Sequence, residues 1–305
     1  MKQGRILTGD CRVRVQFHQP PLALRRFFTT FYLTEIEVPD GQRVTDYLHP
    51  EWGNLRMISG DPPEAEIAGV TPRHDIRDIA TGPTSTTIRF TIGRARIWGI
   101  GLLPLGWSKF VTTPANNLAD SLLDARQEPA FARFVPLLDT LFGDAPDEAA
   151  ELARIEAHFA ARLAEPLADE ARIETCHAAL VDTDVWTVSD MASAAGLPPH
   201  TLERLCRRHF GFAPSLLLRR QRFMRSLAQY MLDPSLKWIG AIDGHYHDQA
   251  QFVRDFHRFM GMGPREYTAR PHPILGAVMH ARMASAGAAV QALHLPEATR
   301  LVTGG

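Results

Sequence analysis

Short stretches of apolar residues, separated by turn residues, fill roughly the first 112 positions of the chain. Residues 28–33 and 87–92 are rich in β-branched and aromatic side chains, a composition that favours strands. Proline and glycine separate such stretches, for example at residues 39–41 and 60–63, where they indicate turns. Several short strands joined by turns predict a mostly-β domain, built as a sandwich or a small barrel.

From about residue 115 the apolar positions recur at helical spacing. Residues 117–123 and 131–138 are therefore expected to be helical, and the alanine-rich residues 148–164 form a longer helix. The apolar stripe of that helix consists of Leu152, Ile155, Phe159 and Leu163. Such a stripe indicates a face for packing or for dimerisation. We expect residues 1–175 to form one N-terminal domain, β-rich to about residue 112 and helical afterwards.

A helix-turn-helix pattern begins at Thr187. Thr187 and Asp190 have the spacing of an N-terminal capping box, which opens a helix. Ala192 precedes Gly196 by four positions; in a helix-turn-helix the small alanine lets the second helix pack closely and the glycine makes the turn. Pro199 suits the first turn of the following helix, where a missing N–H donor costs little. We expect that helix over residues 199–210.

The expected helix has one apolar and one polar face, because a helix turns by about 100° per residue. The inner face consists of Leu202, Leu205 and Cys206, and the outer face of His200, Glu203, Arg204, Arg207 and Arg208. Arginine can donate two hydrogen bonds to guanine in the major groove, and neighbouring cations neutralise phosphates. A solvated basic helix without a DNA partner would have the same pattern, so this helix alone leaves both interpretations open.

A second, similar arrangement follows a long helix that starts at Pro214 and ends near Leu232. Residues 249–260 again form an amphipathic helix. Its inner face consists of Phe252, Val253, Phe256, Phe259 and Met260, and its outer face of Ala250, Gln251, Arg254 and Arg258. Glutamine and arginine suit bidentate contacts to adenine and guanine, respectively. Arg219 and Arg220 on the long helix add candidate phosphate contacts.

The charge distribution supports a nucleic-acid partner, although the net charge of the chain is −1. Residues 184–270 hold 12 Arg and Lys against 8 Asp and Glu, whereas residues 1–183 hold 19 against 25. A basic segment joined to an acidic one is a sign of nucleic-acid binding.

Residues 187–270 resemble the AraC family of transcription regulators. The first half of the likeness is Ala192, Gly196, Leu202-Glu203-Arg204-Leu205 and Phe210-Gly211-Phe212-Ala213-Pro214. The second half is Asp248-Gln249-Ala250-Gln251-Phe252, Arg254-Asp255-Phe256 and Gly261-Met262-Gly263-Pro264-Arg265-Glu266-Tyr267. The resemblance implies two helix-turn-helix units on a connecting helix, with two recognition helices in successive major grooves of double-stranded DNA. By position it implies base contacts from His200, Glu203, Arg204, Gln249, Ala250, Gln251 and Arg254.

This likeness assigns residues 176–270 to an all-α DNA-binding domain, so the expected fold class of the chain is α+β. The N-terminal half resembles, more loosely, the sensor-like domains of some family members. It therefore implies a domain that binds an effector or mediates dimerisation, without naming a ligand. Residues 271–305 are too apolar for a solvated tail, and we expect them to pack back on the protein as a short helix.

One departure from the family pattern falls before the second recognition helix. Counting back from Asp248, the position of the turn glycine falls on His245, and Gly244 lies one residue early. Either the turn is longer here, or His245 adopts a left-handed conformation, which is unfavourable for a residue with a Cβ.

Three other hypotheses concern an effector pocket, a partner protein and a metal site. Trp52, Trp98, Trp107 and Phe110 would either line an effector pocket or form plain core. A partner protein could control the regulator in place of a small molecule. A metal-dependent barrel enzyme is less favoured, because His18, His49 and His74 are isolated and His245-Tyr246-His247 lacks further ligands.

No catalytic residue, metal site or cofactor is therefore expected, and the chain is not expected to be an enzyme. The three cysteines are far apart, and no apolar run reaches the length of a membrane span. These features predict a cytoplasmic protein without a membrane partner, which could act as a homodimer.

Overall fold

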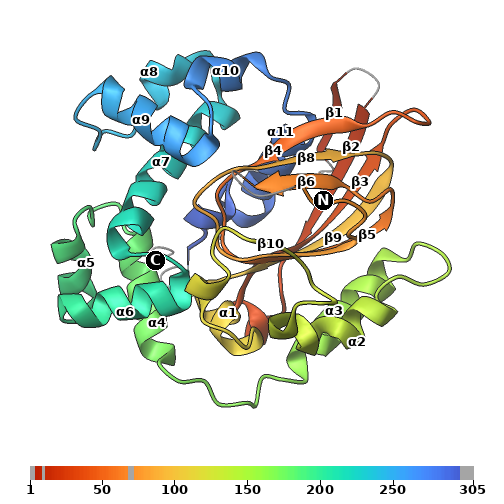
Figure 1. Ribbon diagram of the computed structural model, residues 1–305, viewed down its shortest axis with the longest axis horizontal. Coiled ribbons are helices and arrows are strands. Elements are labelled where there is room, and N and C mark those ends of the chain that lie inside the picture. Colours follow the sequence, from red (N-terminus) through yellow and green to blue (C-terminus); the bar gives the residue numbers. More distant parts are fainter. Residues whose placement is uncertain (1–3, 9–10, 68–71, 296–305) are drawn as a thin grey trace.

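The computed structural model describes residues 4–8, 11–67 and 72–295 (Figure 1). Two antiparallel sheets occupy the N-terminal part. The larger sheet has the order β1 (Gly4–Thr8), β2 (Cys11–His18), β3 (Phe28–Glu37), β9 (Ala95–Leu102), β5 (Asn54–Gly60), β7 (Asp78–Thr81) and β10 (Leu122–Asp124). The smaller sheet has the order β4 (Val44–Leu48), β8 (Ile88–Ile92) and β6 (Glu64–Ile67). The large sheet ends at β1 and β10 without closing, so of the two predicted alternatives the described strands form the sandwich.

The two sheets face each other because their strands alternate apolar and polar side chains. In β8, Ile88, Phe90 and Ile92 are buried and the residues between them are half-exposed. These side chains share one apolar core with Ile36 and Ile58 of the large sheet. The mostly-β prediction for this part of the chain is confirmed.

Helices follow the strands, as the sequence predicts. The short ones are α1 (Pro104–Phe110), α2 (Val135–Thr140), α8 (Lys237–Ala241) and α10 (Pro264–Ala269). The longer ones are α3 (Glu148–Ala160), α4 (Glu170–Val181), α5 (Val188–Ala195), α6 (Pro199–Phe210), α7 (Pro214–Leu232), α9 (Gln249–Met260) and α11 (Pro273–Ala286). Short 3-10 helices lie at Leu22–Leu24, Ala115–Asn117, Pro129–Phe134, Pro234–Leu236 and Gln291–Leu293. None of the helices in the described ranges combines the length and apolar character needed to cross a bilayer.

The predicted helix over residues 117–123 is wrong. A single 3-10 turn ends at Asn117, Asp120 adopts a left-handed φ of 53°, and Leu122–Asp124 form strand β10. The strand forms because the edge of β7 offers it backbone partners, with Leu122 opposite Thr81. Two adjacent apolar residues, Leu122 and Leu123, fit both periodicities, so only the neighbouring strand decides between them.

Aromatic side chains join α3 to the outer face of the large sheet. Phe159 of α3 contacts the rings of Phe28 and Phe110 at centroid distances of 4.5 and 5.0 Å. Ile155 of the predicted stripe is also fully buried in this core. The stripe is therefore used for packing within the chain. The four aromatic residues considered for a pocket, Trp52, Trp98, Trp107 and Phe110, are 2% exposed or less and belong to the same core.

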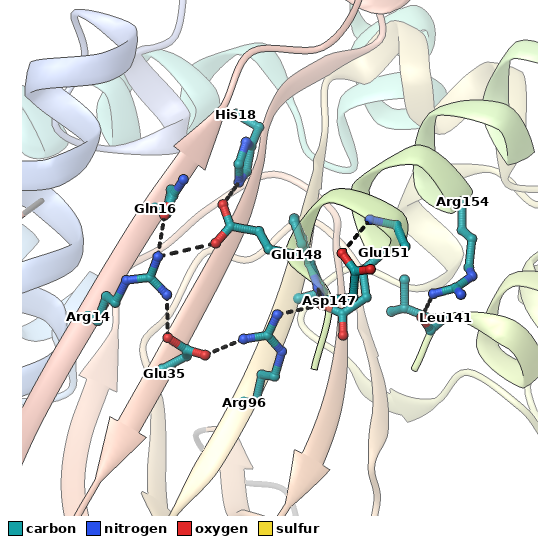
Figure 2. Close-up of polar contacts among 12 residues, drawn as sticks. Arg14, Gln16, His18, Glu35, Arg96, Leu141, Asp147, Glu148, Glu151 and Arg154 are labelled. Carbon is teal, nitrogen blue, oxygen red and sulfur yellow. Dashed lines mark hydrogen bonds and ion pairs between the residues drawn. The ribbon is translucent and has the colours of Figure 1, made fainter. Parts of the chain in front are cut away.

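A chain of charged side chains runs beside this aromatic core (Figure 2). Glu151 of α3 is 1% exposed and accepts hydrogen bonds from the Trp98 indole at 2.6 Å and from Arg96 at 2.7 Å. Arg96 also pairs with Glu35, and Glu35 pairs with Arg14 at 2.6 Å. Glu148, one turn before Glu151, closes the chain on Arg14 at 3.2 Å. Through this network α3 is fixed on β2, β3 and β9.

Glu151→Gln should destabilise the fold, because it removes a buried negative charge that Arg96 and Trp98 both use. We expect a loss of about 2–3 kcal/mol in the free energy of unfolding, measured by urea denaturation. Glu148→Gln is the matched control on the same helix, and it should cost less than about 1 kcal/mol because its ion pairs are partly solvated. Equal losses in the two variants would contradict the role of Glu151.

Candidate nucleic-acid interface

The first helix-turn-helix unit consists of α5, a tight turn and α6. Thr187 accepts a hydrogen bond from the Asp190 N–H, and the Asp190 carboxylate accepts one from the Thr187 N–H, so the predicted capping box is present. Hydrogen bonds from the side chain and the backbone of Thr187 lower the pKa of Asp190. Gly196 ends α5 with a left-handed φ of 62°, and three residues later α6 begins at Pro199. This conformation favours glycine at position 196.

The second unit has a shorter first helix and a longer turn. Its first helix, α8, spans only five residues, and residues 242–248 separate it from α9. Gly244 and His245 are not among the positive-φ residues of the described chain. The turn has thus lengthened, and His245 does not adopt the left-handed conformation that was the alternative.

Asp243 stabilises this longer turn. Its carboxylate accepts hydrogen bonds from the His245 N–H at 3.0 Å and from Arg225 of α7 at 2.5 Å. Its own N–H donates to the Ser226 hydroxyl at 2.8 Å. Burial opposes ionisation of Asp243, but the hydrogen bonds from Arg225 and His245 outweigh burial and lower its pKa. The carboxylate therefore replaces the glycine of the first unit as the element that fixes the turn.

Residues 191–270 match a protein-family model described as a helix-turn-helix domain. This part of the chain is an AraC-type helix-turn-helix domain. The resemblance that the sequence predicts is thereby confirmed. In Figure 1 the two units of the AraC-type domain lie one above the other on the left of the view, joined by α7, with the strands on the right.

Three solved structures are similar to this chain. ToxT from Vibrio cholerae, in a P21 crystal form, is 10% identical and aligns over 85% of this chain and 98% of its own, with a TM-score of 0.42. Wild-type ToxT from Vibrio cholerae strain SCE256, bound to an unsaturated fatty acid, is 8% identical over 85% and 95%, with a TM-score of 0.38. The AraC-like transcriptional activator CuxR is 13% identical over 72% and 82%, with a TM-score of 0.31. No curated protein gave a significant match.

On α6 of the AraC-type domain the predicted outer face is open to solvent. Four of its residues are exposed, namely His200, Arg204, Arg207 and Arg208. Glu203 is half-buried and pairs with Arg207 at 2.7 Å, one helical turn away. The inner residues Leu202, Leu205 and Cys206 are buried in the core, as predicted. Burial raises the pKa of the Cys206 thiol, so this residue is a small apolar core residue.

On α9 the predicted residues divide into two groups. The exposed group consists of Gln249, Ala250, Arg254 and Arg258. Gln251 is half-buried, and its side-chain oxygen accepts a hydrogen bond from the His247 N–H at 3.1 Å. Its own N–H donates to Asp248 at 2.6 Å. Gln251 thus takes part in capping α9, and its side-chain oxygen would have to leave that cap to contact a base.

The arginines of α7 have different roles, which their positions in the sequence do not distinguish. Arg219 and Arg222 pair with Asp255, a fully buried residue of α9, at 2.6 and 3.4 Å. Tyr246 donates to the same carboxylate at 2.9 Å. These contacts fasten the second unit to the connecting helix. Asp255 is a structural residue, and its role depends on Arg219, Arg222 and Tyr246, which the pattern of α9 alone does not indicate.

Arg220 was predicted as a phosphate contact, and this is wrong. Its side chain is fully buried, donates to the carbonyls of Glu51 and Thr84, and lies 4.1 Å from the ring centroid of Trp52. Burial lowers its pKa to about 9. The face of α7 that carries Arg220 is covered by the loops that hold Glu51 and Thr84, and the sequence of α7 alone does not reveal this.

The histidines that were considered as metal ligands have other polar partners. His245 contacts the Asp243 carboxylate through Nδ1 at 2.7 Å, and His49 contacts the Tyr267 hydroxyl at 2.7 Å. Burial, and secondarily His272, lowers the pKa of His49 to about 3. No group of three or more metal-ligating side chains occurs in the described part of the chain.

Arg204 and Arg208 should differ in what they contribute to DNA binding. Arg204→Ala should weaken binding to the preferred site by about 1–3 kcal/mol and relax the preference at one base pair. Arg208→Ala should weaken binding to preferred and random DNA alike. Titrations on both DNAs measure the difference, and equal losses on every sequence in both variants would contradict this assignment.

Arg220→Met should leave the salt dependence of DNA binding unchanged, because the buried guanidinium neutralises no phosphate. Arg208→Ala, by comparison, should reduce the log–log slope of affinity against salt by about 0.9. DNA titrations between low and moderate salt give both slopes. A reduced slope for Arg220→Met would show that Arg220 reaches DNA after all.

Proposed function

We propose that this protein is a transcription regulator that recognises an asymmetric DNA site through α6 and α9, and that a small apolar molecule controls it. The observation that carries the DNA-binding part is the AraC-type domain itself, with exposed cationic side chains on both recognition helices. With this role we expect the protein to act in the cytoplasm.

The two recognition helices differ in chemistry, so one chain should read an asymmetric site. The outer face of α6 offers histidine and arginine, whereas α9 offers glutamine and arginine. If α7 spaces the units to meet successive major grooves, their contacts lie about 34 Å or one helical turn apart. Two different base clusters about 10 base pairs apart are the expected target.

A cavity between the two sheets supports control by a small molecule. It has a volume of about 120 Å³, and most of its lining is apolar, including Ile36 and Ile58 from one sheet and Phe90 from the other. Three charged side chains line it, and two of them, Glu51 and Arg56, pair at 2.7 Å. A concave, mostly apolar space between the sheets favours a small molecule over a partner protein as the effector, because small ligands bind in such pockets and protein partners dock on exposed surfaces.

Selection of bound sequences from random DNA tests the DNA-binding function. The wild type should enrich two unlike base clusters about 10 base pairs apart. The double variant Gln251→Ala/Arg254→Ala should lose the second cluster and keep the first. Arg258→Ala, at an anchoring position of the same helix, should bind more weakly and select the same motif.

Two results would contradict parts of this proposal. An unchanged motif in the double variant would mean that the second unit does not read bases, in keeping with the capping role of Gln251. A failure of the wild type to enrich any sequence would overturn sequence-specific DNA binding.

A further inference from the structure

The chain continues beyond the DNA-binding domain and returns to the N-terminal sheets. We call residues 271–295 the C-terminal strap; it contains α11 and the 3-10 helix Gln291–Leu293. Helix α11 packs against β1, β2 and β4. In Figure 1 it lies behind the strands of the small sheet. Ile274, Leu275 and Ala277 enter the apolar core between the two sheets.

A buried carboxylate fixes the start of the strap. Asp46 of β4 is fully buried and accepts hydrogen bonds from the N–H groups of Ile274 and Leu275, both at 2.9 Å. Its other oxygen lies 3.2 Å from His272. These N–H groups belong to the first turn of α11, where no carbonyl of the helix can satisfy them. Asp46 is thus the attachment point of α11 on the small sheet.

The strap forms one wall of the cavity between the sheets. Strap residues that line the cavity include Leu275, Val278 and Met279. The opposite walls are strands paired along their whole length, such as β5 with β9 over residues 54–60. The strap is held through side chains: besides Asp46, Arg282 donates to Thr30 at 3.2 Å and Gln291 to the Gly53 carbonyl at 3.4 Å. Displacing the strap therefore costs fewer backbone hydrogen bonds than opening a sheet.

The size of the cavity limits what it holds with the strap in place. An apolar protein cavity of about 150 Å³ holds benzene. At about 120 Å³ this cavity has room for an occupant no larger than a single ring. An effector that is larger than one ring and lies wholly between the sheets must displace a wall, and the strap is a helical wall that no strand pairing holds.

The far end of the strap lies in the core of the second helix-turn-helix unit. Met279, Val290 and Ala292 pack in one cluster with Phe223 of α7 and Phe256 of α9. The Gln221 side chain of α7, which is 1% exposed, donates to the Ala292 carbonyl at 2.8 Å. The strap thus connects the cavity physically to the helices that carry and position α9.

We propose that the C-terminal strap is the movable wall of the effector cavity and passes its displacement to the second helix-turn-helix unit. The inference rests on the proposed function and adds the route of regulation. An occupant larger than one ring moves α11 away from the sheets. Because the strap shares the core of α7 and α9, this movement changes the placement of α9 on DNA.

The test uses the full chain, its selected DNA site and N-phenyl-1-naphthylamine, a neutral apolar dye larger than one ring. Dye binding is read by fluorescence, strap mobility by hydrogen exchange of residues 273–286, and DNA affinity by titration. In the wild type the dye should bind, speed exchange in α11 and change the DNA affinity by about fivefold or more. Benzene, which is a single ring, should not speed that exchange.

Asp46→Asn should reproduce the effect of the dye without any ligand. The variant places an amide where the carboxylate accepts two N–H groups, so α11 should loosen and the DNA affinity should shift in the direction that the dye causes. The dye should still bind this variant and change its DNA affinity little further. Asp61→Asn is the matched control, since Asp61 caps the exposed turn at Arg94 and should leave exchange in α11 and the dye response intact.

The possible outcomes distinguish a failure of the strap proposal from a failure of the proposed effector function on which it rests. A dye that fails to bind the wild type would overturn the effector cavity. Dye binding with unchanged exchange in α11, or a wild-type dye response in Asp46→Asn, would overturn the strap and leave the cavity standing. If circular dichroism shows that Asp46→Asn does not fold, Gln221→Ala frees the strap at its other end. Its DNA affinity should then respond less to the dye, and a full response would overturn the proposal.

Discussion

One continuous apolar core joins the outer face of the large sheet to the first helix-turn-helix unit. Trp98 of β9, Phe159 of α3, Cys176 of α4 and Phe210 of α6 all belong to it. The predicted boundary at residue 175 falls within α4, between Ile173 and Cys176, which are both fully buried in this core. Because protein cores are densely packed, the first unit cannot rotate against the sheets without opening that core.

The second unit has a separate core, so it can move relative to the sheets more easily than the first unit can. Its cluster around Phe223, Phe256 and Tyr267 includes strap residues and, among the described strands, Tyr47 alone. The hydrogen bonds of Asp46 and Gln221 connect the second unit to the cavity. They can be broken without opening the core that contains Trp98 and Phe159. The first unit is therefore suited to fix the protein on DNA, and the second to respond to the state of the N-terminal part.

Charged groups at the joints between elements hold this arrangement together. Asp255 fastens α9 to α7, Glu151 fastens α3 to the sheet, and Arg220 fastens α7 to the loops that carry Glu51 and Thr84. Each is buried, so removing one partner leaves the other desolvated without compensation. Glu51 also pairs with Arg56 in the cavity wall, which places the cavity next to the helix that joins the two units.

The sequence by itself determined the mostly-β N-terminal part, the helices of both units and the inner face of each recognition helix. Local rules suffice for these features: the Thr187 capping box, the glycine at position 196 and apolar residues at helical spacing are readable within a few residues. The exposure of Arg204 and Arg254 followed from the same spacing.

Only the tertiary structure decided which polar residues of these elements face solvent and which serve packing. Arg219 and Arg220 are adjacent in the sequence, yet one pairs with Asp255 and the other is buried on Trp52, because different neighbours cover their two sides of α7. Residues 122–124 became a strand because β7 had an unpaired edge beside them. The cavity and its strap likewise depend on residues 274 and 275 returning to Asp46, a contact across more than 220 positions that no local pattern encodes.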